Sequence, residues 1–378
     1  MPDLLHKLFV FIICFCAVQS AALSAPAIIQ SEGMQLELEQ VADGLGIPWG
    51  LSFISDNQLL VTERSGSVRL IDTTSGRKTL LKNSPEVLAE GQGGMLDVAI
   101  SPNYKKDGWI YFTYVKDVDI GAEGATVLAR AKLIKDTFKD WQELLVTKSS
   151  TETSYHFGSR IAFDDDGHVF FGVGDRGVRD NAQDLSNHAG SIMRLNLDGS
   201  VPADNPFSTN KKFLPEVWSV GHRNPQGLVY DYEHKRLWSI EHGPRGGDEI
   251  NLIKAGANYG WPVISYGKEY WGPLAVGEGT HRDGMEQPIK VYTPSIAPGS
   301  LLFYSGDALP KWKGNLFSGA LKLLHINRIV LSKDVTAVKE ERLLEDFGER
   351  IRALAQSPQG WLYFSTDSGK IFRLRLLE

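Results

Sequence analysis

The chain has 378 residues, of which 42% are hydrophobic and 23% are charged, and its formal net charge is −6 at pH 7. This is the composition of an ordinary globular protein, with enough apolar residues for a large core. A mildly acidic chain without a basic run argues against nucleic acid as a partner, and no apolar stretch after the N-terminal one is long enough to span a membrane.

The first 25 residues are predicted to be a cleaved signal peptide. Lys7 supplies positive charge, residues 8–18 are apolar, and small residues follow up to an expected cleavage site after Ala22. Both cysteines of the chain, Cys14 and Cys16, lie in this segment. We therefore expect a periplasmic or secreted protein whose mature form has no disulfide.

The mature chain repeats one pattern, in which a polar turn separates two apolar strands. The first copy is predicted at residues 49–53 and 59–62, and a third strand follows at 67–71. The later copies are predicted at 95–101 with 109–114, 159–163 with 169–173, 226–230 with 237–240, 300–304 with 315–319, and 351–357 with 361–366. The starts are about 45 to 75 residues apart, a spacing typical of propeller blades with insertions.

Six such units predict an all-β fold, a six-bladed β-propeller that forms a single domain over residues 26–378. Residues 34–41 are expected to complete the last blade and so close the ring. The largest insertion, residues 259–298, is rich in Gly, Tyr, Trp and Pro, which favours an ordered cover over one face. A β-sandwich with excursions is the less favoured architecture.

Two polar loops flank the fourth strand pair, only about 20 residues apart. The first, GHRNPQG, places the cation of Arg223 beside the amide of Asn224, a combination that suits a flat, anionic, polar ligand. The second, EHGPRGGDE, sets three glycines and a proline among acids, which suits calcium because both carbonyl and carboxylate oxygens are available. Either loop alone could equally be a polar turn of the propeller.

Two further loops carry single residues suited to chemistry. Gln92 lies among glycines that allow a ligand to approach closely, and His156 comes just before a strand. Histidine is the side chain best able to accept a proton near neutral pH. A lone histidine in this place could also be a surface or hydrogen-bonded residue without a catalytic role.

The last third of the chain supplies cations. Lys322 follows a strand, and alternation along the next blade sends Arg350 and Arg352 to the same side. If these three and Arg223 converge on the ring axis, they would bind a ligand that bears several carboxylates. The alternative for Arg350 and Arg352 is a solvated strand edge.

Several common catalytic motifs are missing from the sequence. It has no H-E-x-x-H zinc motif and no G-x-S-x-G nucleophile elbow, and no cysteine nucleophile would remain after processing. The acidic run at 164–167 resembles part of a calcium loop, but it falls where a hairpin needs turn formers, so we interpret it as a turn.

Six motifs together carry a family resemblance. They are, in order, GQGGMLDVAISP, HFGSRIAFD, GHRNPQGL, EHGPRGGDEINLI, NYGWP and GERIRALAQSPQG. As an ordered set, from about residue 49 to 373, they closely resemble the soluble aldose sugar dehydrogenases that use pyrroloquinoline quinone (PQQ), which are related to the soluble glucose dehydrogenases. The resemblance implies a six-bladed propeller with the quinone at the top of the central axis.

The resemblance also implies residue roles. His156 matches the general base that takes the proton of the sugar's anomeric hydroxyl while a hydride passes to the quinone, and Arg223 matches the residue that stabilises the resulting oxyanion. The positions that match quinone-binding residues are Gln92, Arg223, Asn224, Lys322, Arg350 and Arg352.

Calcium is the second implied cofactor. Gly243 and Pro244 match carbonyl ligands of the calcium ion that polarises the quinone, and Glu249 with the backbone of Tyr259 resembles a further calcium site. One position departs from the pattern, because glucose-oxidising relatives carry an acid directly before the histidine and this chain has Tyr155. The partner of the base must therefore come from elsewhere, and no particular sugar follows.

The leading hypothesis is thus a periplasmic quinoprotein, a monomer or homodimer, that oxidises aldose sugars to lactones and passes electrons to a soluble or membrane acceptor. One alternative is a calcium-dependent propeller lactonase or esterase in which His156 activates water at a metal. Such an enzyme has no need of the cations Lys322, Arg350 and Arg352. Another alternative is a non-catalytic binding propeller. The presence of a proton acceptor, His156, beside a cation-lined centre argues against it.

Overall fold

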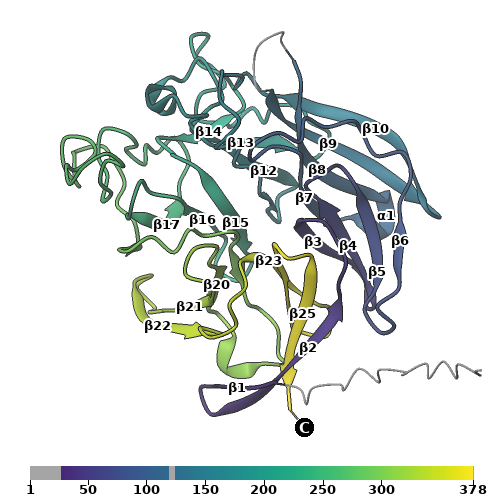
Figure 1. The fold of residues 1–378 in the computed structure, drawn as a ribbon. Helices are drawn as coiled ribbons and strands as arrows, with labels where there is room; N and C mark the ends of the chain where they lie inside the picture. Colours follow the sequence, from purple (N-terminus) through teal and green to yellow (C-terminus); the bar gives the residue numbers. More distant parts are fainter. Residues whose placement is uncertain (1–26, 119–123, 378) are drawn as a thin grey trace, which may run out of the picture.

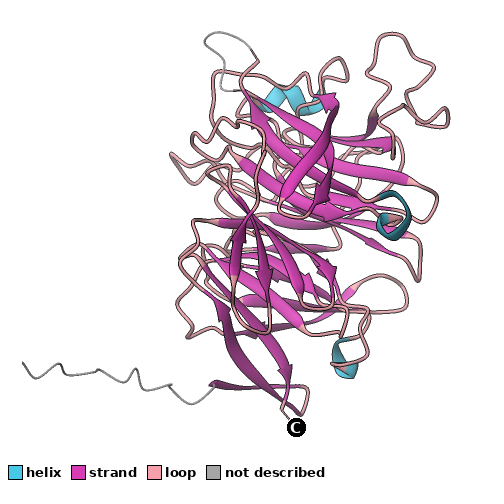
Figure 2. Ribbon diagram, turned by 90° about the vertical axis from the view of Figure 1, so that its right-hand side faces the viewer, coloured by secondary structure: helices cyan, strands magenta, loops and turns pink. Residues whose placement is uncertain are grey.

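The computed structural model describes residues 27–118 and 124–377. Six antiparallel sheets stand around a common axis, five of them with four strands and one with five, so the prediction of an all-β, six-bladed propeller is confirmed (Figure 1). Figure 2, turned by 90°, shows that strands and loops make up almost all of the described chain. The predicted signal peptide, residues 1–25, lies outside the described residues.

Each of the predicted strand pairs forms the first two strands of one blade. Blade 1 has β3 (Pro48–Ser55), β4 (Gln58–Glu63), β5 (Val68–Asp72) and β6 (Lys78–Leu80); blade 2 has β7 (Met95–Ile100), β8 (Trp109–Lys116), β9 (Ala125–Ile134) and β10 (Thr137–Val146); blade 3 has β11 (Ile161–Phe163), β12 (His168–Val173), β13 (Ser191–Asn196) and β14 (Val217–Val220).

The second half of the ring repeats this order. Blade 4 has β15 (Pro225–Asp231), β16 (Arg236–Glu241), β17 (Asp248–Ile253) and β18 (Lys290–Tyr292); blade 5 has β19 (Leu302–Phe303), β20 (Leu316–Gly319), β21 (Ile326–Leu331) and β22 (Ala337–Leu343); blade 6 has β23 (Ile351–Gln356), β24 (Leu362–Thr366), β25 (Lys370–Leu376), β2 (Met34–Ala42) and β1 (Ala27–Ser31). Short helices are α1 (Tyr104–Asp107), η1 (Arg179–Gln183) and η2 (Pro310–Trp312).

The ring closes by pairing the two ends of the chain, as predicted. Strand β2 runs antiparallel to β25, from Leu36 opposite Leu376 to Ala42 opposite Ile371, and Figure 1 shows the two strands side by side. The buried guanidinium of Arg328 in blade 5 pairs with Glu32 in the turn between β1 and β2. The N-terminal hairpin is thereby tied to the neighbouring blade as well as to its own.

The core lies between adjacent blades. Aliphatic and aromatic side chains from facing sheets pack together there, and Trp238, Phe112 and Phe317 are among the side chains that are fully buried. Burial of this kind between every pair of neighbours is the main favourable contribution to folding, because the sheets have no helices to cover their faces.

Two features differ from the sequence-based expectation. The outermost strand of each blade was not predicted, because an exposed strand such as β10 carries few buried residues and so shows no apolar run. Strand β11 begins at Ile161 rather than at residue 159, because Gly158 and Ser159 have φ values of 62° and 95°, outside the β region.

The six innermost strands, β3, β7, β11, β15, β19 and β23, contact one another in sequence around the axis. Their first residues face one end of the axis and their last residues the other, so the loops that precede them gather at one end. None of the helices in residues 27–118 and 124–377 is long and apolar enough to cross a membrane.

Candidate active site

All six blades contribute to a cavity of about 250 Å³ at the end of the axis where the innermost strands begin. Four predicted residues lie in its wall: the amides Gln92 and Asn224 and the cations Arg350 and Arg352. The other lining residues are Ile47, Trp49, Arg64, Leu96, Phe157, Gly158, Gln226, His242, Ala297, Leu321 and Asp367. Residues more than 250 positions apart in the sequence therefore meet in one pocket.

Arg350 and Arg352 point to the same side, as alternation predicts, and share one carboxylate. Asp367 accepts from Arg350 Nε at 2.8 Å and from Arg352 Nε and Nη2 at 2.8 and 2.9 Å. Burial acts to raise the pKa of Asp367, but the two guanidinium groups outweigh it and hold that pKa below its usual value. Asp367 thus fixes both arginines at the wall of the cavity, a role the sequence did not indicate.

Arg64 is a third arginine in this wall and was also missed. It follows β4, and its Nη1 donates to the carbonyl oxygen of Gly91 at 2.7 Å, on the loop that carries Gln92. Three guanidinium groups face one carboxylate in the cavity lining, so the cavity carries a net positive charge. This electrostatic balance favours an anionic ligand with more than one acidic group.

Lys322 stands apart from the other predicted cations. Its side chain is exposed, and it is the preceding residue, Leu321, that lines the cavity. Its backbone N–H donates to the carbonyl oxygen of Ile296 at 3.0 Å, which fixes the backbone of the loop. Of the four cations predicted to converge, Arg350 and Arg352 therefore line this cavity, Arg223 lines the smaller cavity described below, and Lys322 lines neither.

His156 stands next to the cavity and has a buried acid as its partner. Its Nδ1 lies 2.7 Å from Oδ1 of Asp175, while its backbone N–H donates to the cavity residue Gln92 at 2.9 Å. Asp175 is itself held by Trp261 Nε1 at 2.7 Å and by the N–H of Gly177 at 2.8 Å. With Nδ1–H bound to Asp175, the Nε2 atom of His156 is the basic nitrogen.

Asp175 explains how the chain manages without an acid at Tyr155. It lies 19 positions after His156, on the loop that follows β12, and is 1% exposed. The close approach of the two loops requires Gly174, since a Cβ at that position would meet the carbonyl oxygen of His156 at 2.5 Å and that of Arg223 at 2.8 Å. The sequence signal was weak, because a Gly-Asp-Arg-Gly run also suits an ordinary turn.

The surroundings keep His156 neutral at physiological pH. Burial is the largest cause and lowers the pKa of His156 below its usual value of 6.5; the hydrogen bond to Asp175 opposes this, and the nearby charge of Arg223 adds to the lowering. Burial raises the pKa of Asp175, but His156 and Arg223 bring it below its ordinary value. The pair is thus an imidazole ready to accept a proton and a carboxylate ready to stabilise the product.

Arg223, whose charge is close to His156, is bound to the loop that carries His242. Its Nη1 donates to the carbonyl oxygen of His242 at 3.1 Å, and its guanidinium carbon lies 5.3 Å from the ring centre of Trp261. Its backbone N–H donates to Glu241 at 2.6 Å. Within the described parts of the chain, its buried Nε has no hydrogen-bond partner, which leaves one donor for a ligand.

Asn224, the next residue, helps to hold the cavity wall in shape. Its Oδ1 accepts from the N–H of Gly158 at 3.3 Å and from Gln226 Nε2 at 3.2 Å. The amide nitrogen of Asn224 is therefore directed away from these donors, since one side-chain oxygen takes both bonds. The loop that carries Arg223 and the loop that carries His156 are thus cross-linked at the cavity wall.

The four predicted metal-binding residues line a second, smaller cavity of about 20 Å³ beside the first. They are Gly243, Pro244, Glu249 and Tyr259. Gly243 has no room for a side chain, because a Cβ there would lie 2.1 Å from the carbonyl oxygen of Gly247. A cavity of this size holds one ion or one water molecule.

Buried carboxylates give this small cavity its chemistry. Burial raises the pKa of Glu249 to about 8, and the adjacent Glu241 carboxylate adds to the shift. Asn251 Nδ2 is 3.5 Å from Glu249, and the buried Oδ1 of Asn251 has no hydrogen-bond partner in the described chain. Such oxygen atoms without a neighbouring cation fit a hard cation such as calcium.

Asp248, in contrast, is an organiser of the loop. It is fully buried, accepts from Gly243 N–H at 2.9 Å and binds Ser295 and Ala297 across the insertion. Residues 27–118 and 124–377 contain no group of three or more His, Cys, Asp or Glu arranged to bind a metal. A metal in the small cavity would therefore depend on backbone carbonyls together with Glu249.

Comparisons with known proteins identify the family. Residues 45–373 match the family described as Glucose / Sorbosone dehydrogenase. The chain is 37% identical to Aldose sugar dehydrogenase YliI of Escherichia coli, over 98% of this chain and 99% of that protein. The resemblance seen in the sequence motifs is thereby confirmed.

Solved structures of aldose sugar dehydrogenases have the same fold as this chain. The apo form of the soluble aldose sugar dehydrogenase of Escherichia coli superposes with a TM-score of 0.86 at 34% identity, over 90% of this chain and 100% of that one. The PQQ-bound aldose sugar dehydrogenase of Streptomyces coelicolor has a TM-score of 0.75 at 26% identity, over 93% of this chain and 100% of that one. The chain therefore belongs to the glucose/sorbosone dehydrogenase family of oxidoreductase enzymes.

Proposed function

We propose that this protein oxidises aldose sugars at the anomeric carbon to lactones, with PQQ as the hydride acceptor and His156 as the general base. The observation that carries the proposal is the pair of His156 with the buried Asp175, at 2.7 Å, beside a cavity lined by three arginines. The names of similar proteins, an aldose sugar dehydrogenase and a PQQ-bound relative, support the same chemistry.

The cavity suits PQQ, which is a flat tricarboxylate. Arg64, Arg350 and Arg352 provide guanidinium groups for carboxylates, and the amides of Gln92 and Asn224 provide polar contacts at the same wall. The buried Nε of Arg223, without a partner in the described chain, is a further donor. Lys322, which is exposed, would approach such a ligand from outside the cavity.

His156 would act on the hydroxyl group of the anomeric carbon. Its Nε2 takes the hydroxyl proton while the hydrogen on the same carbon leaves with its electron pair, so that the carbon becomes the carbonyl of a lactone. Bound PQQ supplies the electrophilic carbonyl that accepts this hydride. Asp175 holds the imidazole in the productive tautomer and stabilises the imidazolium that forms.

Arg223 and a calcium ion would provide positive charge where negative charge develops. Arg223 is held by His242 and by Glu241, so its guanidinium is already in place before reaction. Gly243 and Pro244 would present carbonyl oxygens to a calcium ion next to the acceptor, and Glu249 with the backbone of Tyr259 is the other candidate set of ligands in the small cavity, which has room for one ion.

We further propose that the protein is exported to the periplasm and passes its electrons to a soluble or membrane acceptor. The support is the N-terminal sequence, with Lys7, the apolar residues 8–18 and small residues up to Ala22. Mass spectrometry of the protein purified from the periplasmic fraction would give the mature N-terminus, and a full-length mass would contradict cleavage.

Reconstitution tests the proposed activity. The apoprotein is incubated with PQQ, with calcium, with both or with neither, and oxidation of a panel of aldoses is followed with a dye as electron acceptor. We expect activity only when both are present, and a change in the absorption spectrum of the bound quinone when an aldose is added without dye. A quinone spectrum that no aldose changes would contradict the proposal.

A further inference from the structure

One arginine on the propeller axis makes contacts with every blade. Arg160 comes directly before β11 in blade 3, and its guanidinium carbon lies 3.9 Å from the ring centre of Trp49 in blade 1. Its Nη1 is 2.9 Å from Oδ1 of Asp97 in blade 2. The remaining donors reach carbonyl oxygens of blades 4, 5 and 6: Gln226 at 3.2 Å from Nε, and Gly299 at 2.6 Å and Arg352 at 3.2 Å from Nη2.

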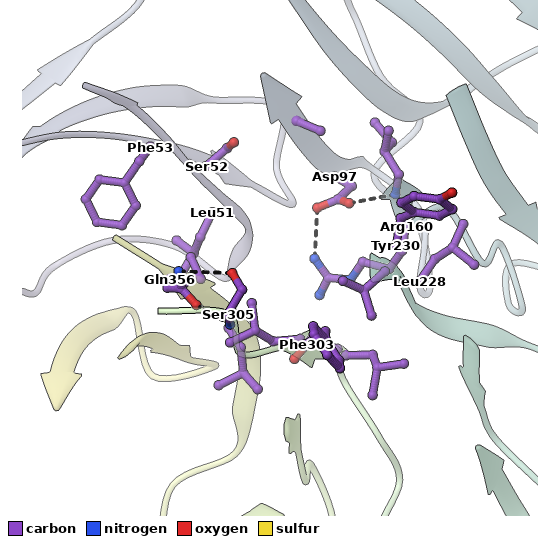
Figure 3. A pocket seen from close by; sticks show the side chains of 18 of the residues that line it. Leu51, Ser52, Phe53, Asp97, Arg160, Leu228, Tyr230, Phe303, Ser305 and Gln356 are labelled. Carbon is purple, nitrogen blue, oxygen red and sulfur yellow. Dashed lines mark hydrogen bonds and ion pairs between the residues drawn. The ribbon is translucent and has the colours of Figure 1, made fainter. Parts of the chain in front are cut away.

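This hub separates two cavities. Arg160 and Asp97 line the cavity of about 600 Å³ at the end of the axis where the innermost strands finish, and Figure 3 shows the guanidinium of Arg160 joined to the carboxylate of Asp97 in its wall. Trp49, Gln226 and Arg352, which Arg160 contacts, line the smaller cavity of about 250 Å³. The guanidinium therefore lies behind the inner wall of the candidate cofactor site.

The ion pair is almost fully buried and well satisfied. The side chains of Arg160 and Asp97 are 7% and 10% exposed, and the second carboxylate oxygen of Asp97 accepts from the N–H of Ile161 at 2.9 Å. A buried ion pair adds little net stability, because desolvation of the charges offsets their attraction. The pair instead favours one arrangement of the blades that it joins, since the planar guanidinium group of an arginine holds its partners in fixed directions.

The partners of Arg160 are residues that shape the cofactor cavity. The carbonyl of Arg352 belongs to the same residue whose side chain binds Asp367 in the cavity wall, and Gln226 binds Asn224 in that wall. A shift of one blade at the hub would therefore move a guanidinium or an amide that faces the ligand. Displacements of about 1 Å are enough to weaken such polar contacts.

We infer that Arg160, paired with Asp97, is a positioning residue that sets the register of the six blades beneath the cofactor cavity and thereby determines the affinity for PQQ. The inference rests on the proposed function. It assigns to Arg160 no contact with the sugar and no part in proton transfer, so the affinity for quinone is the property that depends on it.

Arg160→Lys is the direct test, since it keeps the charge and the pair with Asp97 but cannot reach three carbonyls and the indole together. Quinone binding to the apoprotein is titrated by absorption and fluorescence, well below the melting temperature, on protein shown to be folded by circular dichroism. We expect quinone affinity to fall at least about tenfold, because several charge-assisted hydrogen bonds are lost. At saturating quinone, KM for the sugar should stay within about twofold.

Two further variants make the test decisive. Arg328→Lys changes another buried arginine with several acidic and amide partners, which lines neither of the two cavities, and should lower the melting temperature without changing quinone affinity. Asp97→Asn keeps the fork of Arg160 but removes the opposing charge, and should weaken quinone binding about threefold. This variant decides the matter if Arg160→Lys does not fold.

The outcomes separate the two proposals. If wild-type protein binds quinone, and Arg160→Lys or, in its place, Asp97→Asn binds it equally well, the inference is wrong and the proposed function stands. If the variants lose melting temperature but keep quinone affinity, as Arg328→Lys should, the hub is only structural and the inference is again wrong. If wild-type protein binds no quinone in the presence of calcium, the proposed function fails and the inference fails with it.

Discussion

The two ends of the propeller axis differ more in chemistry than in architecture. The end where the innermost strands begin has a cavity of about 250 Å³ with three arginines, two amides that the sequence motifs single out, and the His156–Asp175 pair beside it. The end where these strands finish has a cavity of about 600 Å³, lined largely by residues of the strands themselves, such as Leu51, Leu228 and Leu354. Both are built from all six blades.

The two ends differ in the loops that line them and not in the ring of blades that they share. At the end of the axis with the larger cavity, called the wide end, side chains alternate along regular strands, and Asp97 and Arg160 find hydrogen-bond partners within the protein. At the other end, which has the smaller cavity and is called the narrow end, Gly158, Gly174 and Gly243 let loops approach each other, and the buried Nε of Arg223 has no hydrogen-bond partner in the described chain. The larger of the two cavities is therefore not the one that the predicted cofactor-binding residues line.

The largest expected effect comes from His156→Gln at the narrow end. Loss of the general base should lower kcat about a thousandfold while quinone still binds, because glutamine cannot accept the proton. His168→Gln is the matched control, since His168, the first residue of β12 in the same blade, has a similar bond to Asp164 in the turn that follows β11. Turnover above a tenth of wild type in His156→Gln would contradict the assignment.

Asp175→Asn should have the next largest effect, about a hundredfold on kcat, because the imidazole loses both its orientation and its counter-charge. The direction in which the pH profile of kcat shifts is an independent test of this role. Asp175 raises the pKa of His156, so its removal lowers that pKa further, and the acid limb of the kcat profile should move to lower pH. An acid limb that moves to higher pH, or Asp164→Asn with an equal loss, would show that Asp175 is not the partner of the base.

Removal of a carboxylate tests the small cavity next to this site. Glu249→Gln should weaken calcium binding by roughly thirtyfold, since a charged ligand is replaced by a neutral one. Isothermal titration with the metal-free protein measures this directly. Glu278→Gln, which removes an exposed acid paired with Arg282, is the control and should leave calcium affinity unchanged. Equal calcium affinity in both variants would place the ion elsewhere.

The two arginines of blade 6 differ in burial, so their substitution tests how burial affects quinone binding. Arg352 is 14% exposed and Arg350 51%, so Arg352→Gln should weaken quinone binding about tenfold and Arg350→Gln less, because solvent screens the more exposed charge. Lys322→Gln should have the smallest effect of the three. Arg373→Gln, in the same sheet but paired with Glu39, serves as control. The reverse order would mean that burial does not govern these contacts.

The smallest effect is expected at the wide end of the axis. Gln356 and Ser305 are hydrogen-bonded to each other in the wall of the larger cavity, as Figure 3 shows. Gln356→Ala should change kcat/KM by less than about twofold, as is usual for substitutions away from a reacting group. A loss comparable with that of Asp175→Asn would erase the distinction between the two ends.

Much of the site could be predicted because its residues stand in short runs with unusual composition. Gln92, His156, Arg223 and Arg350 lie within five residues before the start of a strand, and strand starts are easy to place from alternating apolar residues. Asp175, Asp367 and Arg64 were missed, since each lies on a turn after a strand, where aspartate and arginine are common and carry no signal of their own. Lys322 was predicted to converge with the others, but it is exposed and does not line the cavity.

The sequence by itself determined the number of blades, the closure of the ring by residues 34–41 and the family motifs, because hydrophobic alternation and turn chemistry are local properties. Only the tertiary structure decided which residues meet. The bond between His156 and Asp175, the sharing of Asp367 by two arginines and the reach of Arg160 to all six blades depend on how strands curve around an axis. That curvature arises from packing between blades, which no single stretch of sequence encodes.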